Sequence, residues 1–98
     1  MSYDSQINEY RKKMRNIDAA KPNVKAAIDN YNEAKEELNK VKGFARCEDI
    51  KGKISSKITD LEALINKMKS DYESYEEKIR YLKRKKAEAE RAAKEQVK

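Results

Sequence analysis

The sequence contains no histidine, no tryptophan and a single cysteine, Cys47. One cysteine cannot form an internal disulfide, and without histidine a structural zinc site lacks its usual ligands. The same absences remove the usual pairings of a nucleophile with a general base. We therefore expect no catalytic residue, no metal site and no cofactor. We interpret Cys47 as an incidental thiol near a turn.

Glycine and proline are also scarce, with two glycines and one proline in 98 residues. Such a chain has room for only one or two sharp reversals. Charged residues make up 43% of the sequence and hydrophobic residues 38%. This composition is typical either of long helices or of disorder, and the periodicity of the apolar residues distinguishes the two.

Long hydrophobic runs are absent as well. No apolar run approaches the roughly 18 residues that a membrane-spanning helix needs, so we expect no transmembrane segment. Residues 1–5 have neither the basic nor the apolar region of a signal peptide. We expect the protein to be made in the cytoplasm, and any export to use a route independent of the general signal peptide.

Apolar residues form two stripes with alternating steps of three and four. The first stripe consists of Ile7, Tyr10, Met14, Ile17, Lys21, Val24, Ile28, Tyr31, Lys35 and Leu38. The second consists of Ile54, Ile58, Leu61, Ile65, Met68, Tyr72, Tyr75, Ile79 and Leu82. This spacing is the heptad pattern of a coiled coil and does not fit a strand, which alternates with period two. Beyond Leu82 the stripe becomes small and polar, so we expect that end to protrude or fray.

Residues 43–52 separate the two stripes and include both glycines. Gly43 is suited to end the first helix, because glycine accepts the left-handed conformation found at many helix C-termini. We predict one domain over residues 1–98, with helices over 3–42 and 53–95 and a turn over 43–52. An earlier start of the second helix, near Glu48, is an open alternative. The predicted fold is an all-α, antiparallel two-helix coiled-coil hairpin.

Proline 22 interrupts the first stripe without changing its phase. Proline inside a helix lacks an N–H and clashes with the preceding turn. We predict a kink or a short break near Pro22 rather than a change of direction.

A reversal near residue 47 sets the expected register between the two stripes. It places Ile17 beside Ile79, Ile28 beside Met68, Leu38 beside Ile58 and Val41 beside Ile54. Two helices alone cover each stripe on one side only, and a chain this small usually needs a further staple or a partner. We therefore predict binding to another helical protein or to a second copy. The expected partner-binding residues are Tyr10, Ile28, Tyr31, Ile65, Met68, Tyr72, Tyr75 and Ile79.

A basic run lies late in the second stripe and comprises Lys78, Arg80, Lys83, Arg84, Lys85 and Lys86. Such a run can contact nucleic acid or an anionic membrane surface, and it can equally be the solvated flank of a coiled coil. No aromatic or glycine-rich recognition element accompanies it. We therefore favour the solvated flank and regard nucleic acid as the less expected partner.

The chain has an aromatic-x-x-x-acid spacing at Tyr72 and Glu76, which lie one turn apart on a helix. With about 100 residues, two long helices around a short turn and this element late in the second helix, the chain resembles the WXG-type helical hairpins of type VII secretion. The family's Trp-x-Gly turn is absent, and the high charge is more similar to the accessory hairpins encoded beside LXG toxins. The resemblance implies a targeting factor or chaperone that packs on the toxin's helical N-terminal region, with Tyr72 and Glu76 as the candidate secretion signal. A generic coiled-coil adaptor or oligomerisation subunit remains the alternative.

Overall fold

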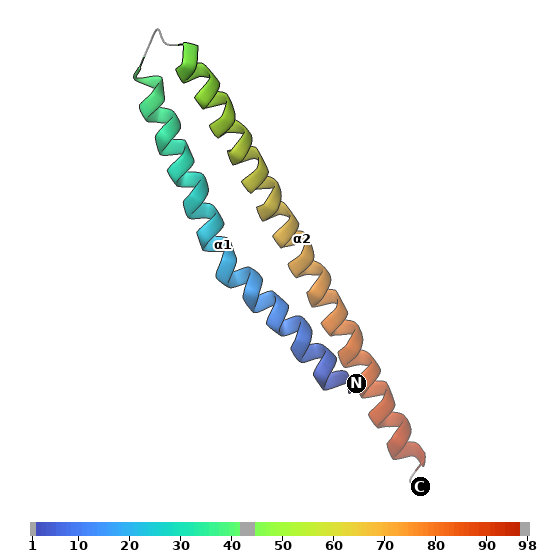
Figure 1. Cartoon of the computed structure of the whole chain (residues 1–98). Helices are drawn as coiled ribbons and strands as arrows, with labels where there is room; N and C mark the ends of the chain where they lie inside the picture. Colours follow the sequence, from blue (N-terminus) through green and yellow to red (C-terminus); the bar gives the residue numbers. More distant parts are fainter. Residues whose placement is uncertain (1, 42–44, 97–98) are drawn as a thin grey trace. The chain divides into compact units, whose positions relative to one another are not determined.

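The computed structural model describes residues 2–41 and 45–96, and these residues form two helices (Figure 1). Helix α1 covers Tyr3–Asn39 and has 37 residues, and helix α2 covers Ala45–Gln96 and has 52 residues. The described residues include no strand. The two helices form a hairpin, which confirms the predicted all-α fold.

The ends of α1 are defined by local hydrogen bonds. The hydroxyl oxygen of Ser2 accepts a hydrogen bond from the backbone N–H of Ser5 at 3.1 Å, which makes Ser2 the N-cap of the helix. At the other end, the backbone N–H groups of Lys40 and Val41 donate to the carbonyl oxygens three residues earlier, at 3.2 and 3.1 Å. These tighter bonds satisfy carbonyl groups that would otherwise lack partners at the helix end.

The connection between the helices is shorter than predicted. Helix α2 already begins at Ala45 and runs through Gly52, so the predicted turn over 43–52 and the helix start at residue 53 are wrong. The early start, named above as an alternative near Glu48, is the observed one. The reason is physical: a glycine within a helix costs only about 1 kcal/mol, and the helix is long enough to absorb it. The predicted role of Gly43 lies outside the described residues.

Helix α1 continues through Pro22 without interruption. The predicted break therefore does not occur, while the predicted kink stays a prediction. Pro22 is exposed.

The packing of the chain divides it into two compact units. Unit 1 comprises Met1–Asp18 with Lys69–Lys98, and unit 2 comprises Ala19–Met68. Each unit contains a segment of α1 and a segment of α2, and their boundary in α1 falls about one turn before Pro22. The prediction of a single domain over residues 1–98 stays a prediction.

Unit 1 contains the buried core of the described residues. Ile7 from α1 is 4% exposed, and Ile79 and Leu82 from α2 are each 7% exposed. Tyr10 and Met14 pack against this cluster. The segments are antiparallel, because Asp4 contacts Lys86 whereas Tyr10, later in α1, contacts Tyr75, earlier in α2.

The register within unit 1 differs from the predicted one. Ile79 packs with Ile7, and with Tyr10 and Met14 beside it, rather than with Ile17. The helices are thus shifted by roughly one heptad relative to the prediction, and a shift of that size keeps both apolar stripes facing each other. The pairs predicted within unit 2 stay predictions.

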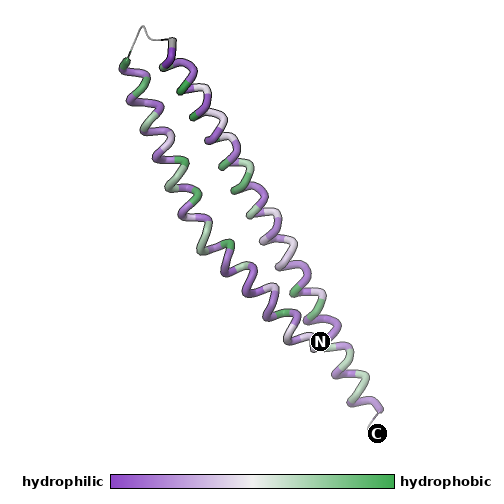
Figure 2. Tube along the Cα trace, in the orientation of Figure 1, coloured by the Kyte–Doolittle hydropathy of each residue, from purple (hydrophilic) through white to green (hydrophobic). Residues whose placement is uncertain are grey.

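Unit 2 has the same heptad stripe but none of its described residues is buried. The bands of hydrophobic residues recur along both helices in Figure 2. In unit 2 these residues are half-buried or exposed, with Tyr31 37% and Leu64 40% exposed. The apolar stripe of unit 2 is therefore only partly covered by the chain itself.

Candidate interaction surfaces

The heptad pattern predicts which side chains are shielded from solvent. All nine residues of the second stripe, Ile54 to Leu82, are buried or half-buried. In the first stripe Tyr31 is the one exposed member, and the two lysines, Lys21 and Lys35, are half-buried. Long lysine side chains cover apolar surface with their methylene groups while the ammonium stays in water. After Lys86 every described residue of α2 is exposed although the helix continues to Gln96, so this end protrudes as expected.

The predicted partner-binding residues fall into two groups. In unit 1, Ile79 belongs to the buried core, and Tyr10 and Tyr75 contact each other. In unit 2, Ile28, Ile65 and Met68 are half-buried and Tyr31 is exposed. The chain uses the first group for its own packing, whereas the second group leaves apolar surface open to solvent. Tyr72, the remaining member, is half-buried in unit 1.

Tyr10 and Tyr75 form the centre of a four-residue cluster in unit 1. Their ring centroids lie 5.6 Å apart, with an interplanar angle of 31°. The ammonium of Lys13 lies 5.5 and 5.6 Å from the two centroids, and that of Lys78 lies 5.4 and 5.8 Å from them. Cation–π contacts at exposed sites contribute about 0.5–1 kcal/mol each. The cluster links α1 to α2 beside the buried core.

The role of the two lysines was not predicted from the sequence. The available signal is their spacing, since Lys13 follows Tyr10 by three residues and Lys78 follows Tyr75 by three residues. Residues three apart lie on one face of a helix, so each lysine can reach the ring on its own helix. Contact with the second ring depends on the register between the helices.

The candidate secretion signal, Tyr72 and Glu76, lies on α2 in unit 1. Both side chains are half-buried. A carboxylate oxygen of Glu76 is 3.9 Å from the guanidinium of Arg80, a long ion pair between partly exposed groups. Exposed pairs of this kind contribute little to stability. Part of both side chains is accessible to solvent, as a recognition element requires.

The basic run does not form one continuous positive face. Lys78 contacts the two tyrosine rings, and Lys86 reaches α1. Lys85 lies 3.4 Å from a carboxylate oxygen of Glu88 and 5.6 Å from the ring centroid of Tyr81. These contacts use part of the charge of the basic run within the chain, and the choice between a solvated flank and a phosphate-binding surface stays a prediction.

The interhelical ion pair of unit 1 joins Asp4 to Lys86. The Lys86 ammonium donates a hydrogen bond to the Asp4 carboxylate at 2.8 Å. This hydrogen bond, with the attraction of the Asp4 charge, raises the pKa of Lys86 above its ordinary value of 10.5. Lys86 is therefore protonated over the whole neutral range, and the pair fixes the first turn of α1 against α2.

Three further features of the described residues bear on chemistry. Residues 2–41 and 45–96 contain no group of three or more Cys, Asp or Glu side chains placed to hold a metal ion. Neither described helix is long and apolar enough to cross a membrane. Cys47 is half-buried in the first turn of α2.

Comparisons with models of known protein families, with curated proteins and with solved structures find no match to this chain. The resemblance to WXG-type hairpins therefore stays a prediction. Within the described residues, the chain leaves one periodic apolar surface partly covered, the stripe of unit 2.

Proposed function

We propose that this chain is a non-catalytic helical binding protein whose unit 2 packs against helices of another protein. One observation carries the proposal: the stripe of unit 2 has full heptad periodicity, yet none of its described residues is buried. Full burial of a Val, Leu, Ile or Met side chain stabilises by about 1.5–3 kcal/mol, so half-covered residues leave part of this free energy unrealised. A helix laid along the stripe would supply the missing cover.

The proposed partner is the helical N-terminal region of a type VII secreted toxin, for which this chain would act as a targeting factor or chaperone. Support comes from the two-helix hairpin and from the partly exposed Tyr72 and Glu76 on one face of α2. A generic adaptor or oligomerisation subunit would use the same stripe and is the alternative. An export role would require a route that does not depend on a general signal peptide.

Binding is tested by co-expressing the chain with the helical N-terminal region of an LXG toxin and measuring the mass of the purified complex by light scattering. Tyr31→Ser lies on the stripe but is exposed, so it is expected to weaken the complex about tenfold while the helical content is unchanged. Tyr81→Ser, the same substitution at an exposed tyrosine of unit 1, is the matched control. Absence of a complex, or equal effects of the two substitutions, would contradict the proposal.

The targeting role is tested separately by measuring export of the co-expressed pair. Glu76→Ala is expected to lower export without changing the unfolding midpoint, because its ion pair with Arg80 is long and partly exposed. Glu90→Ala is the control, since it removes an exposed carboxylate of the same helix outside the aromatic-x-x-x-acid spacing. If both variants are exported like the wild type, the adaptor alternative replaces the targeting role.

A further inference from the structure

A second surface lies in unit 1, on a face of α2 separate from the stripe. Its residues follow the stripe residues of α2 by one or two positions, so they share one side of the helix. We name this surface the charged flank, and it consists of Glu73, Glu76, Glu77, Arg80, Lys83 and Arg84. All six are exposed except Glu76, which is half-buried.

The two signs of charge are segregated along this flank. Residues 71–77 contain four acidic and no basic side chains, and residues 78–86 contain six basic and no acidic ones. Within the described residues, Glu73, Glu77, Lys83 and Arg84 form no ion pair with the rest of the chain. The one pair on the flank, Glu76 with Arg80, is long at 3.9 Å. Most of the charge on the flank is therefore available to a partner.

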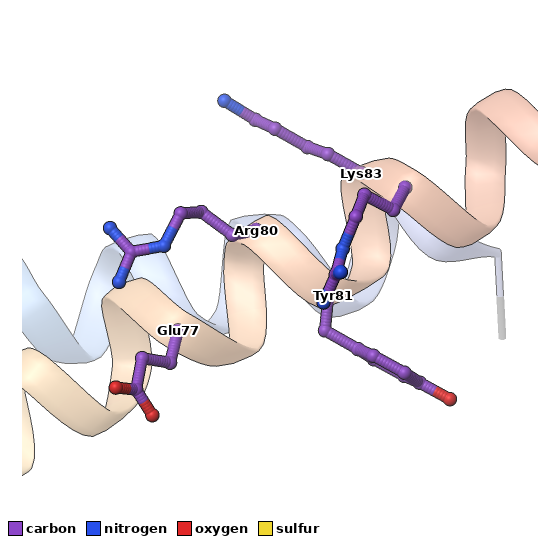
Figure 3. Close-up of a pocket in the computed structure, with 5 residues that line it drawn as sticks. Glu77, Arg80, Tyr81 and Lys83 are labelled. Carbon is purple, nitrogen blue, oxygen red and sulfur yellow. The ribbon is translucent and has the colours of Figure 1, made fainter.

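A shallow hollow on the basic half of the flank adds apolar surface. It is lined by Glu77, Arg80, Tyr81, Lys83 and Arg84, and the labelled side chains project outward from α2 in Figure 3. Tyr81 is 52% exposed, the largest exposed fraction among the large hydrophobic residues described. Tyrosine is enriched at protein interfaces, where its ring provides contact area and its hydroxyl can stay wet.

We propose that a second copy of this chain docks antiparallel on the charged flank. A two-fold axis that crosses α2 between Glu77 and Arg80 places Glu73 opposite Arg84 of the second copy and Glu77 opposite Arg80 of the second copy. The symmetry repeats each pair, so the two pairs become four complementary contacts. A parallel arrangement instead places like charges together, which is unfavourable.

The order of acidic and basic residues along the charged flank also disfavours other binding partners. Nucleic acid or an anionic membrane would face the acidic half of the flank as well as the basic half, and the acidic half repels phosphate. An acidic peptide meets the same repulsion. Only a partner with the reversed order of charges satisfies both halves, and an antiparallel copy of the chain has that order.

The expected dimer is weak and depends on salt, because its complementary charges are exposed. Sedimentation equilibrium of the full chain is expected to show a dimer that dissociates about tenfold more readily at ~500 mM than at ~50 mM NaCl. Two double variants test the pairing: Glu73→Lys with Glu77→Lys makes the flank wholly basic, and Arg80→Glu with Arg84→Glu makes it wholly acidic. Each alone is expected to be monomeric, and an equimolar mixture of the two is expected to form a heterodimer.

The controls reverse the same number of exposed charges elsewhere on α2. They are Asp60→Lys with Glu62→Lys, and Lys53→Glu with Lys57→Glu, all in unit 2 and all exposed. Both controls are expected to dimerise like the wild type. Three results would each overturn the proposal. They are a wild-type chain that stays monomeric at ~1 mM protein and low salt, an equal loss of dimer in variants and controls, and the absence of a heterodimer in the mixture. The Tyr31→Ser substitution leaves the charged flank intact, so failure of the toxin complex and failure of this dimer are separate results.

Discussion

The rings of Tyr10 and Tyr75 face each other across the two helices of unit 1, with 5.6 Å between their centroids. Each ring also has the ammonium groups of Lys13 and Lys78 within 5.8 Å of its centroid. This contact lies beside the Ile7, Ile79 and Leu82 core. The same four side chains therefore combine an aromatic pair with four cation–π contacts beside the buried core of unit 1.

The aromatic pair leads to the first prediction. Tyr10→Leu keeps an apolar side chain but removes the ring, and it is expected to lower the free energy of unfolding by about 1 kcal/mol. Urea unfolding followed by circular dichroism measures this value. Tyr75→Leu and the double variant complete a thermodynamic cycle, in which a coupling free energy near zero would contradict a direct Tyr10–Tyr75 interaction. Tyr81→Leu is the control at an exposed tyrosine and is expected to change stability by less than about 0.5 kcal/mol.

The second prediction concerns the difference in burial between the two units. Ile79→Val removes a methyl group from the buried core of unit 1 and is expected to cost about 0.5–1.5 kcal/mol. Ile65→Val makes the same change in the half-buried stripe of unit 2 and is expected to cost less than about 0.5 kcal/mol. Chemical unfolding of the isolated chain compares the two. Equal costs would mean that the stripe of unit 2 is shielded from solvent to the same degree as the core of unit 1.

The third prediction follows from the position of Gly52 inside α2. A Cβ atom added at Gly52 meets no atom within 4 Å, so the substitution creates no clash. Gly52→Ala is expected to stabilise the chain by about 0.5–1 kcal/mol, because alanine loses less backbone entropy in a helix. The midpoint of thermal unfolding measures the change. A loss of stability would indicate that residue 52 belongs to a turn, as the sequence alone first suggested.

The fourth prediction concerns pH and the Asp4–Lys86 pair. Because the folded chain raises the pKa of Lys86 above 10.5, protonated Lys86 is favoured in the folded state, and its contribution is fully present below 10.5. That contribution is lost as the pH rises above 10.5 and through the raised pKa of the folded state. Asp4→Asn removes the carboxylate, so the stability difference between wild type and variant is expected to be constant from neutral pH to about pH 10 and to shrink at higher pH.

The measurement is the urea midpoint of both proteins across this pH range. Comparing the two proteins isolates the contribution of the Asp4–Lys86 pair, because the rest of the sequence is common to both. Added salt is expected to reduce the difference at neutral pH, since both side chains are partly exposed. A difference that grew with pH would contradict the assigned pairing.

The sequence by itself determined which faces of the helices are covered. The alternating steps of three and four from Ile54 to Leu82 identify side chains that are all buried or half-buried, because in a coiled coil only those positions return to the same side of the helix. The same pattern could not determine how far one helix slides along the other. A shift of one heptad leaves both stripes in contact, so the pairing of Ile79 with Ile7 rather than Ile17 is invisible in the periodicity.

Only the tertiary structure decided that register and what depends on it. Within unit 1 the observed register places Tyr75 beside Tyr10 and Lys86 beside Asp4. The tertiary structure also decided that the described buried core lies in unit 1, while the equally periodic stripe of unit 2 stays partly exposed to solvent. Periodicity is a property of a single helix, whereas burial depends on the side chains that the opposite helix brings to each position. For that reason the sequence indicates the apolar face of each helix, and the fold indicates which part of that face the chain leaves partly covered.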